Sequence, residues 1–179
     1  ENVTGLVKGT AKGYFKRILA ELRACGYQVS CKILDGRWLG VPQARQRTIF
    51  IGVRNDLNLP PVHPAPFSYY YTAREGLAGV SEPGEKEIKF LTPETKTETL
   101  WQRTIPGKTF AEACKAMTGK GTFFNFAKLD PEAIAPTITA TAQHFHWAEP
   151  RLLTIPEVKR LCGFPDDFVL SGEFLQRWE

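Results

Sequence analysis

The sequence predicts an α/β fold that is interrupted by an irregular, loop-rich lobe, and three observations support this class. Residues 1–58 carry a helical stripe followed by two strand patterns. Residues 59–150 open with clustered prolines and then hold only short aromatic or β-branched runs separated by glycine and proline. Residues 151–179 begin with a second clear helix signal. A chain of 179 residues can form one domain, or one domain with a smaller insertion.

The first expected element is a helix over residues 12–24. Apolar side chains recur there at spacings of three and four, at Phe15, Ile18, Leu19 and Leu22. Cys25-Gly26 follows this stripe, and glycine is typical of the end of a helix. The pattern therefore predicts an amphipathic helix.

Two strands are expected after this helix. Val29, Cys31 and Ile33 alternate with polar residues, which predicts a half-buried strand. The run from Thr48 to Val53 is almost entirely apolar, and it predicts a second strand that is buried on both faces.

The segment Gly40-Val41-Pro42-Gln43-Ala44-Arg45-Gln46-Arg47 forms a tight turn just before the second strand and is the strongest candidate for a site. Arg45 and Arg47 occupy alternate positions, so on an extended backbone both guanidinium groups point the same way. Strand ends are where α/β proteins place their ligands. Two arginines that are simply exposed to solvent at the start of a strand, with no ligand, would give the same pattern.

The middle of the chain is expected to be an insertion made mostly of loops. A short helix is expected near residues 109–117, and residues 121–126 and 137–141 are short aromatic or β-branched runs. His144 and His146 form the only histidine-rich cluster, and with the distant His63 they offer too few ligands for a zinc site. A stacked loop at the solvent edge is the preferred interpretation of that cluster.

The last part of the chain begins with a capping box. Thr154 is followed three residues later by Glu157, and Pro156 lies in the first turn. A helix is therefore expected from this point, and Gly163 ends it.

Charge and composition narrow the classes of function. The formal net charge is +4, and residues 1–60 hold ten Lys or Arg against four Asp or Glu. This excess suits a polyanion such as nucleic acid, although solvated helices give the same count. No apolar run is long enough for a membrane span, and no signal peptide is expected. Four widely spaced cysteines indicate reduced thiols, so a cytoplasmic location is expected.

Three motifs occur in an order that is specific to one family. They are Glu1-Asn2-Val3, the segment from Gly40 to Arg47, and Arg151-Leu152-Leu153-Thr154 with Gly163-Phe164-Pro165-Asp166-Asp167-Phe168. Together they resemble the Glu-Asn-Val, Gln-x-Arg-x-Arg and late Arg-x-Leu-Thr/Gly-Phe-Pro motifs of the DNA cytosine-5 methyltransferases. The resemblance covers both ends of the chain.

The resemblance implies a partial Rossmann-like methyltransferase core. Residues 1–58 would be its C-terminal half, residues 59–150 a small mixed α+β target recognition domain, and residues 151–179 a helix that returns to the core. The expected partner is double-stranded DNA, in a bacterial or phage setting, with no membrane partner. S-adenosylmethionine would be bound mainly by an N-terminal half that the chain lacks, and no metal is expected.

The same resemblance assigns roles to individual residues. Glu1 would contact N3 of a flipped-out cytosine, and Arg47 would donate to its O2; Arg45 completes the expected catalytic set. Gln43 and Arg45 would hold the loop and reach the nucleotide backbone. Thr137 and Ile138 stand where the family has a Thr-Leu pair, so the threonine could bind a phosphate and the isoleucine could contact a base or sugar.

Three family features are missing from this sequence, and one of them is the terminal Gly-Asn-x-Val segment that completes the cofactor pocket in the family. The nucleophile of the family is a cysteine that follows proline, and no cysteine here does so: Cys25, Cys31, Cys114, Cys162. The Phe-x-Gly-x-Gly turn for the cofactor is also absent. The chain is therefore expected to be a fragment that is inactive alone. A DNA-binding recognition subunit of a split methyltransferase and an RNA cytosine methyltransferase relative remain as alternatives.

Overall fold

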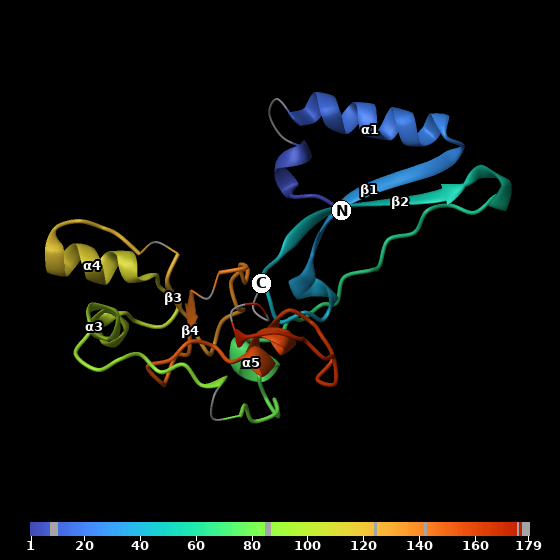
Figure 1. The fold of residues 1–179 in the computed structure, drawn as a ribbon. Helices are drawn as coiled ribbons and strands as arrows, with labels where there is room; N and C mark the ends of the chain where they lie inside the picture. Colours follow the sequence, from blue (N-terminus) through green and yellow to red (C-terminus); the bar gives the residue numbers. More distant parts are fainter. Residues whose placement is uncertain (8–10, 85–86, 124, 142, 175, 177–179) are drawn as a thin grey trace.

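The computed structural model describes residues 1–7, 11–84, 87–123, 125–141, 143–174 and 176, and it has the expected mixed α/β character. The described elements fall into two groups (Figure 1). One group contains the N-terminal helix and a long hairpin, and the other contains the remaining helices around two very short strands. The candidate loop lies where the two groups meet.

The first group is a helix packed on an antiparallel hairpin. Helix α1 spans Lys12–Ala24, as the apolar stripe predicts, and it ends where Gly26 adopts a φ of 86°. Strand β1 (Tyr27–Asp35) pairs with β2 (Gln46–Arg54) along its full length. Phe15 of α1 contacts Phe50 of β2, with ring centroids 5.8 Å apart, so α1 covers one face of the hairpin. Two short 3-10 helices flank this group, η1 (Thr4–Val7) and η4 (Asn55–Leu57).

The expectation that the second strand is buried on both faces is wrong for this chain. Within the described residues the sheet has only the strands β1 and β2. Thr48 is fully buried, whereas Ile49 and Ile51 are half-buried and Ile33 of the expected half-buried strand is 46% exposed. The apolar run indicates a strand correctly, but burial on both faces needs further neighbours.

The second group includes four short helices and a minimal parallel strand pair. The helices are α2 (Ala73–Gly76), α3 (Lys96–Arg103), α4 (Phe110–Thr118) and α5 (Ile155–Leu161). Strands β3 (Ala127–Lys128) and β4 (His144–Phe145) pair with each other. Helix α4 lies where the sequence predicts one, whereas α2 and α3 were not expected. The runs at 121–126 and 137–141 form no strand within their described residues.

Two apolar clusters hold this group together. Phe110 of α4 stacks on Phe145 of β4 with centroids 4.8 Å apart, and Leu100 of α3 and Cys114 complete that cluster. The other cluster joins α2, α5 and the loops between them through buried side chains that include Leu129, Ile138, Leu153 and Leu161. Burial of these side chains fixes α5 against the chain that precedes β4.

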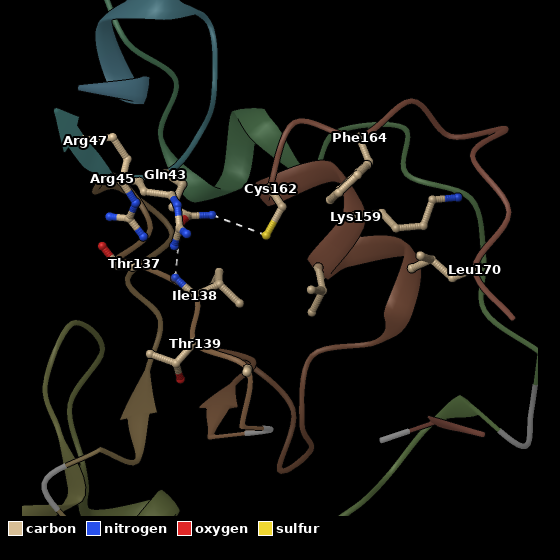
Figure 2. Close-up of a pocket in the computed structure, with 12 residues that line it drawn as sticks. Gln43, Arg45, Arg47, Thr137, Ile138, Thr139, Lys159, Cys162, Phe164 and Leu170 are labelled. Carbon is tan, nitrogen blue, oxygen red and sulfur yellow. Dashed lines mark hydrogen bonds between the residues drawn. The ribbon is translucent and has the colours of Figure 1, made fainter. Parts of the chain in front are cut away.

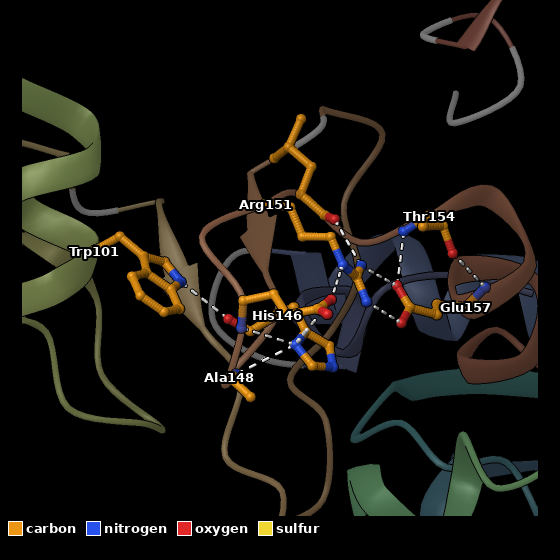
Figure 3. Close-up of polar contacts among 8 residues, drawn as sticks. Trp101, His146, Ala148, Arg151, Thr154 and Glu157 are labelled. Carbon is orange, nitrogen blue, oxygen red and sulfur yellow. Dashed lines mark hydrogen bonds and ion pairs between the residues drawn. The ribbon is translucent and has the colours of Figure 1, made fainter. Parts of the chain in front are cut away.

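A buried ion pair fixes the start of α5 (Figure 3). The Arg151 guanidinium donates two hydrogen bonds to the Glu157 carboxylate, at 2.8 and 2.9 Å. Glu157 also accepts from the Thr154 backbone N–H at 2.8 Å, which confirms the predicted capping box. Burial alone raises the pKa of Glu157, but the hydrogen bonds from Arg151 and Thr154 outweigh it and hold that pKa below its usual value.

The histidine cluster only partly matches the expected loop at the solvent edge. His146 stacks on Trp147, with centroids 4.2 Å apart, and its backbone carbonyl accepts from the Trp101 indole (Figure 3). His144, however, is 4% exposed because it belongs to β4. Among the described residues, no helix is both long enough and apolar enough to cross a membrane.

Candidate functional site

The candidate loop forms one wall of a pocket of about 670 Å³. The other walls come from the segment before β4 and from α5 with the turn that follows it (Figure 2). The lining residues are Gln43, Arg45, Arg47, Thr137, Ile138, Thr139, Ala140, Val158, Lys159, Cys162, Phe164 and Leu170. The pocket thus joins all five residues predicted from the arginine loop and the Thr-Ile pair.

The loop owes its shape to backbone contacts at both of its ends. It follows the 3-10 helix η3 (Gly36–Leu39), and Gly40 takes a φ of 86° that a residue with a side chain rarely adopts. The Val41 N–H donates to the Gly36 carbonyl, and the Gly36 N–H donates to the Arg45 carbonyl, both at 3.0 Å. These bonds close the loop before β2 begins.

Helix α2 presses on the loop from outside the pocket. A Cβ atom added to Gly76 would lie 2.5 Å from the Pro42 Cβ, which is closer than two carbon atoms that are not bonded to each other can approach. Pro42 is itself buried. The glycine therefore allows the second group of elements to pack directly against the loop.

Gln43 does not face open solvent, although it was expected to reach the nucleotide backbone. Its side chain is 1% exposed, and its amide bonds to the protein at both ends (Figure 2). The Nε2 group donates to the Leu161 carbonyl at 3.2 Å and to the Cys162 sulfur at 3.3 Å, and Oε1 accepts from the Ile138 N–H at 3.3 Å. The amide thus joins the loop to two other segments, and the expected contact of Gln43 with the nucleotide backbone stays a prediction.

The two arginines differ in their partners. The Arg47 Nε donates to the Glu1 carboxylate at 3.2 Å, and one of its terminal nitrogens donates to the Gln46 carbonyl at 2.8 Å. Arg45 is half-buried and has no carboxylate partner within the described ranges. Glu1 does not line the pocket, but its contact with Arg47 places it beside the pocket. A free guanidinium next to a paired one gives this wall a net positive charge.

Thr137 and Ile138 pack against the arginine loop. The Thr137 hydroxyl donates to the Ala44 carbonyl at 2.6 Å, and the Ala44 N–H donates to the Ala135 carbonyl at 2.8 Å. Ile138 is 6% exposed and packs in an apolar cluster. Its expected contact with a base or sugar is therefore restricted to the small part of its side chain that lines the pocket.

Sequence reasoning missed the wall that α5 and the following turn supply. Lys159 and Cys162 line the pocket, together with the apolar side chains Val158, Phe164 and Leu170. The Lys159 ammonium donates to the Asp166 carbonyl at 2.7 Å. Burial raises the pKa of the Cys162 thiol, so this sulfur is a poor candidate for a thiolate nucleophile. The capping box followed by Gly163-Phe164 was the available signal, but it was interpreted as structural.

The pocket combines cationic and apolar surface in one cavity. Arg45 and Arg47 supply its cationic groups, since the Lys159 ammonium is bonded to the Asp166 carbonyl and points away from the arginines (Figure 2). No carboxylate lines the pocket in the part of the chain that the structure describes. Guanidinium groups bind phosphate and carbonyl oxygens through charge-assisted hydrogen bonds. Apolar walls accept the faces of flat rings. The arrangement therefore suits an anionic ligand that also carries an apolar ring. Among the described residues, no group of three or more side chains could hold a metal ion.

Comparison with known proteins adds a family match across nearly the whole chain. The model of the family described as C-5 cytosine-specific DNA methylase matches residues 1–177. The Type II methyltransferase M.BspRI of Lysinibacillus sphaericus is 39% identical over 181 residues, which cover 96% of this chain and 41% of that protein. The Type II methyltransferase M.NgoFVII of Neisseria gonorrhoeae is 28% identical over 188 residues, covering 96% of this chain and 50% of its own length.

A solved structure shows the same fold. The DNMT2 of Spodoptera frugiperda superposes with a TM-score of 0.61 at 15% sequence identity, over 99% of this chain and 59% of that one. The present chain spans about half the length of the curated relatives it matches.

Proposed function

The chain belongs to the C-5 cytosine-specific DNA methylase family, and we propose that it supplies the base-holding arginine loop and the DNA-recognition segment of a DNA cytosine-5 methyltransferase. In this proposal the substrate is a cytosine in duplex DNA that is flipped out of the stack, because its C5 and C6 atoms cannot be reached inside the duplex. The description of the matched family, C-5 cytosine-specific DNA methylase, supports DNA rather than RNA as the substrate.

The observation that carries the proposal is the contact between Glu1 and Arg47. Addition of a nucleophile at C6 of cytosine places negative charge on N3 and O2, which are both attached to C2. Two groups that stabilise this charge must therefore lie next to each other. The 3.2 Å separation between the Arg47 Nε and the Glu1 carboxylate oxygen meets that requirement. We assign Arg47 to O2 and Glu1 to N3; the Glu1 carboxylate, which is paired with Arg47 in the free chain, takes up a proton from solvent when it exchanges that pair for N3.

Arg45 is assigned to the phosphate next to the flipped nucleotide. Its guanidinium lines the same pocket as Arg47 and has no carboxylate partner in the described ranges, so no ion pair has to break when a phosphate binds. Thr137 also lines the pocket, but its one hydroxyl hydrogen is donated to the Ala44 carbonyl, so it holds the loop and has no hydrogen left for a phosphate. The Arg45 contact positions the DNA backbone without reading its sequence.

The proposed organisation follows the expected division. Residues 1–58 act as part of the catalytic core, residues 59–150 act as the target recognition domain, and residues 151–179 return to the core. Helix α5 supports this division, because its residues pack on both the arginine loop and the segment before β4. Because bacterial relatives are named Type II methyltransferases, we propose that the protein acts in the cytoplasm, at the nucleoid.

The residues of this chain do not fit the methyl donor. S-adenosylmethionine carries one carboxylate that an arginine could bind, but its sulfonium and ammonium groups need anionic or carbonyl partners. The pocket offers Arg45 and Arg47 instead, with no carboxylate among its described lining residues. We propose that the donor and the Pro-Cys nucleophile belong to the other half of the enzyme, which would be part of the same protein or a partner subunit.

The test is methyl transfer from labelled S-adenosylmethionine to duplex DNA. The chain is assayed alone and then with a polypeptide that carries the Pro-Cys and Phe-x-Gly-x-Gly motifs of the family. We expect transfer only in the mixture, with duplex DNA preferred over RNA of the same sequence. Transfer to RNA alone, or retention of DNA binding with no transfer in any mixture, would count against the proposed function.

A further inference from the structure

Three segments that are distant in the sequence meet at the amide of Gln43. The amide belongs to the arginine loop, accepts a hydrogen bond from the Ile138 backbone and donates to the Leu161 carbonyl and the Cys162 sulfur. The partners lie 95, 118 and 119 positions further along the chain. One neutral side chain therefore joins the loop, the segment before β4 and the end of α5 (Figure 2).

The burial of Gln43 gives these bonds their importance. The side chain is 1% exposed, so water cannot replace a partner that is lost. An unpaired buried amide is costly, and the three segments are therefore held at one relative position. Gly163, which adopts a φ of 81°, brings the turn after α5 close to the loop, since a Cβ added there would lie 3.3 Å from a methyl carbon of Val41.

The cationic side chains of the pocket depend on this junction. Arg45 follows two residues after Gln43, and its own guanidinium has no carboxylate partner in the described ranges to fix it. Ala44, which lies between them, is hydrogen-bonded through both of its backbone groups. Its carbonyl accepts from the Thr137 hydroxyl, and its N–H donates to the Ala135 carbonyl. The position of Arg45 thus follows from the junction rather than from its own contacts.

We propose that Gln43 is a positioning residue that couples the segment 137–139 to the arginine loop, so that Arg45 and Arg47 are presented to DNA together with that segment. Gln43 contacts no nucleotide in this proposal. DNA that contacts the segment 137–139 therefore contacts Arg45 at the same time, because Gln43 fixes the two segments relative to each other. The inference deepens the proposed function and rests on it.

The test uses the salt dependence of binding by the full chain to a fluorescent duplex. Each phosphate that is neutralised by a protein cation contributes about 0.9 to the slope of log affinity against log salt concentration. Gln43→Met keeps the size of the side chain and removes the amide. We expect this neutral substitution to reduce the slope by about 0.9, as Arg45→Gln does, because Arg45 loses its position.

Gln46→Met is the matched control. Gln46 lies three residues away at the start of β2, and its amide bonds only to the Asp35 carboxylate on an exposed face. We expect an unchanged slope for this variant. A lower fraction of folded protein changes the amplitude of binding but not its salt slope, so the readout separates positioning from a loss of folding. The double variant Gln43→Met/Arg45→Gln should have the slope of either single variant.

A second variant covers the case in which Gln43→Met does not fold. Cys162→Ala removes one acceptor of the Gln43 amide and leaves the Leu161 carbonyl in place. We expect a slope between those of the unsubstituted chain and Arg45→Gln. An unchanged slope in Gln43→Met or, if that variant is unfolded, in Cys162→Ala would overturn the inference and leave the proposed function standing. If the slope reductions of Gln43→Met and Arg45→Gln add up in the double variant, the inference is likewise overturned and the proposed function stands. No DNA binding by the unsubstituted chain would overturn both.

Discussion

Arg47 and Glu1 form an ion pair across 46 positions of sequence, with the guanidinium Nε 3.2 Å from the carboxylate oxygen. The Asn2 and Thr48 backbones bond to each other beside it, at 2.9 and 2.7 Å, so the pair is held by the chain and not only by its charges. Two family motifs are thereby brought together at one end of the hairpin. The geometry of this pair underlies the proposed roles of both residues.

Substitution of Glu1 should affect chemistry more than binding. Glu1→Gln keeps the shape of the side chain but cannot supply a proton to N3 of cytosine. We expect kcat of the reconstituted enzyme to fall by about 100-fold, which is the lower end of the range for general acid–base groups. Glu21→Gln on α1 is the control, because Glu21 is an exposed partner of Arg17. Equal activity of the Glu1 and Glu21 variants would contradict the assigned role.

Stability should fall in mildly acidic solution because of His144. Burial lowers the pKa of His144 to about 4, below its ordinary value of 6.5. Between these values the unfolded chain takes up the proton and the folded chain does not, so stability decreases as the pH falls. The expected loss between pH 6.5 and pH 5 is roughly 1.5 kcal/mol in the free energy of urea unfolding.

The variant His144→Gln tests this assignment. Its side chain is neutral at every pH, so the loss of stability on acidification should become smaller. Burial also lowers the pKa of His146, which stays in the variant and leaves part of the pH dependence. An equal pH dependence in the original and variant chains would rule out His144 as the source.

Contact between α2 and the arginine loop should make Gly76 intolerant of a methyl group. Gly76→Ala would place a carbon 2.5 Å from the Pro42 Cβ, so one of the two segments has to move. We expect a loss of about 1–3 kcal/mol in unfolding free energy, the usual cost of overpacking. Gly84→Ala is the control because a Cβ there meets nothing within 4 Å. Similar stabilities of the two variants, measured by urea unfolding, would disprove the tight contact.

The exposed hairpin should promote self-association of the isolated chain. Strand β1 pairs only with β2 in the described part of the chain, and Ile33 on β1 is 46% exposed. Uncovered strand edges and apolar side chains favour contacts between copies. Light scattering should show a mass that rises with concentration, and Ile33→Lys should reduce the rise. A constant monomer mass at high concentration would refute the expectation.

The sequence predicted those elements whose signals are local. Helix α1 follows from an apolar stripe, and α5 follows from the capping box of Thr154 and Glu157. Helix α3 was missed because its stretch is mainly polar, and its N-cap bond from Glu98 to Thr95 lies in a threonine-rich segment that resembles a loop. Local patterns thus identify elements with strong periodicity and miss those that packing stabilises.

The sequence identified several of the residues that line the candidate site, but not the contacts that each of them makes. The residues from the arginine loop and the Thr-Ile pair line one pocket, as the motif order implies. The burial of Gln43 could not be predicted, because its partners Ile138 and Leu161 lie far along the chain. Lys159 was overlooked because a lysine on a helix is usually a solvated residue. Long-range packing decides these roles, and one sequence does not encode it in a local pattern.

The most direct test of the central claim is methyl transfer to duplex DNA by the reconstituted enzyme carrying Arg47→Gln. The control is Arg54→Gln, at the other end of β2, where Arg54 pairs with Asp56 in solvent. Loss of one donor to a developing oxyanion costs about 100- to 1,000-fold in kcat. We expect a loss of this size for Arg47→Gln, with little change for Arg54→Gln. Equal rates for the two variants would contradict the assignment of Arg47 to the cytosine O2.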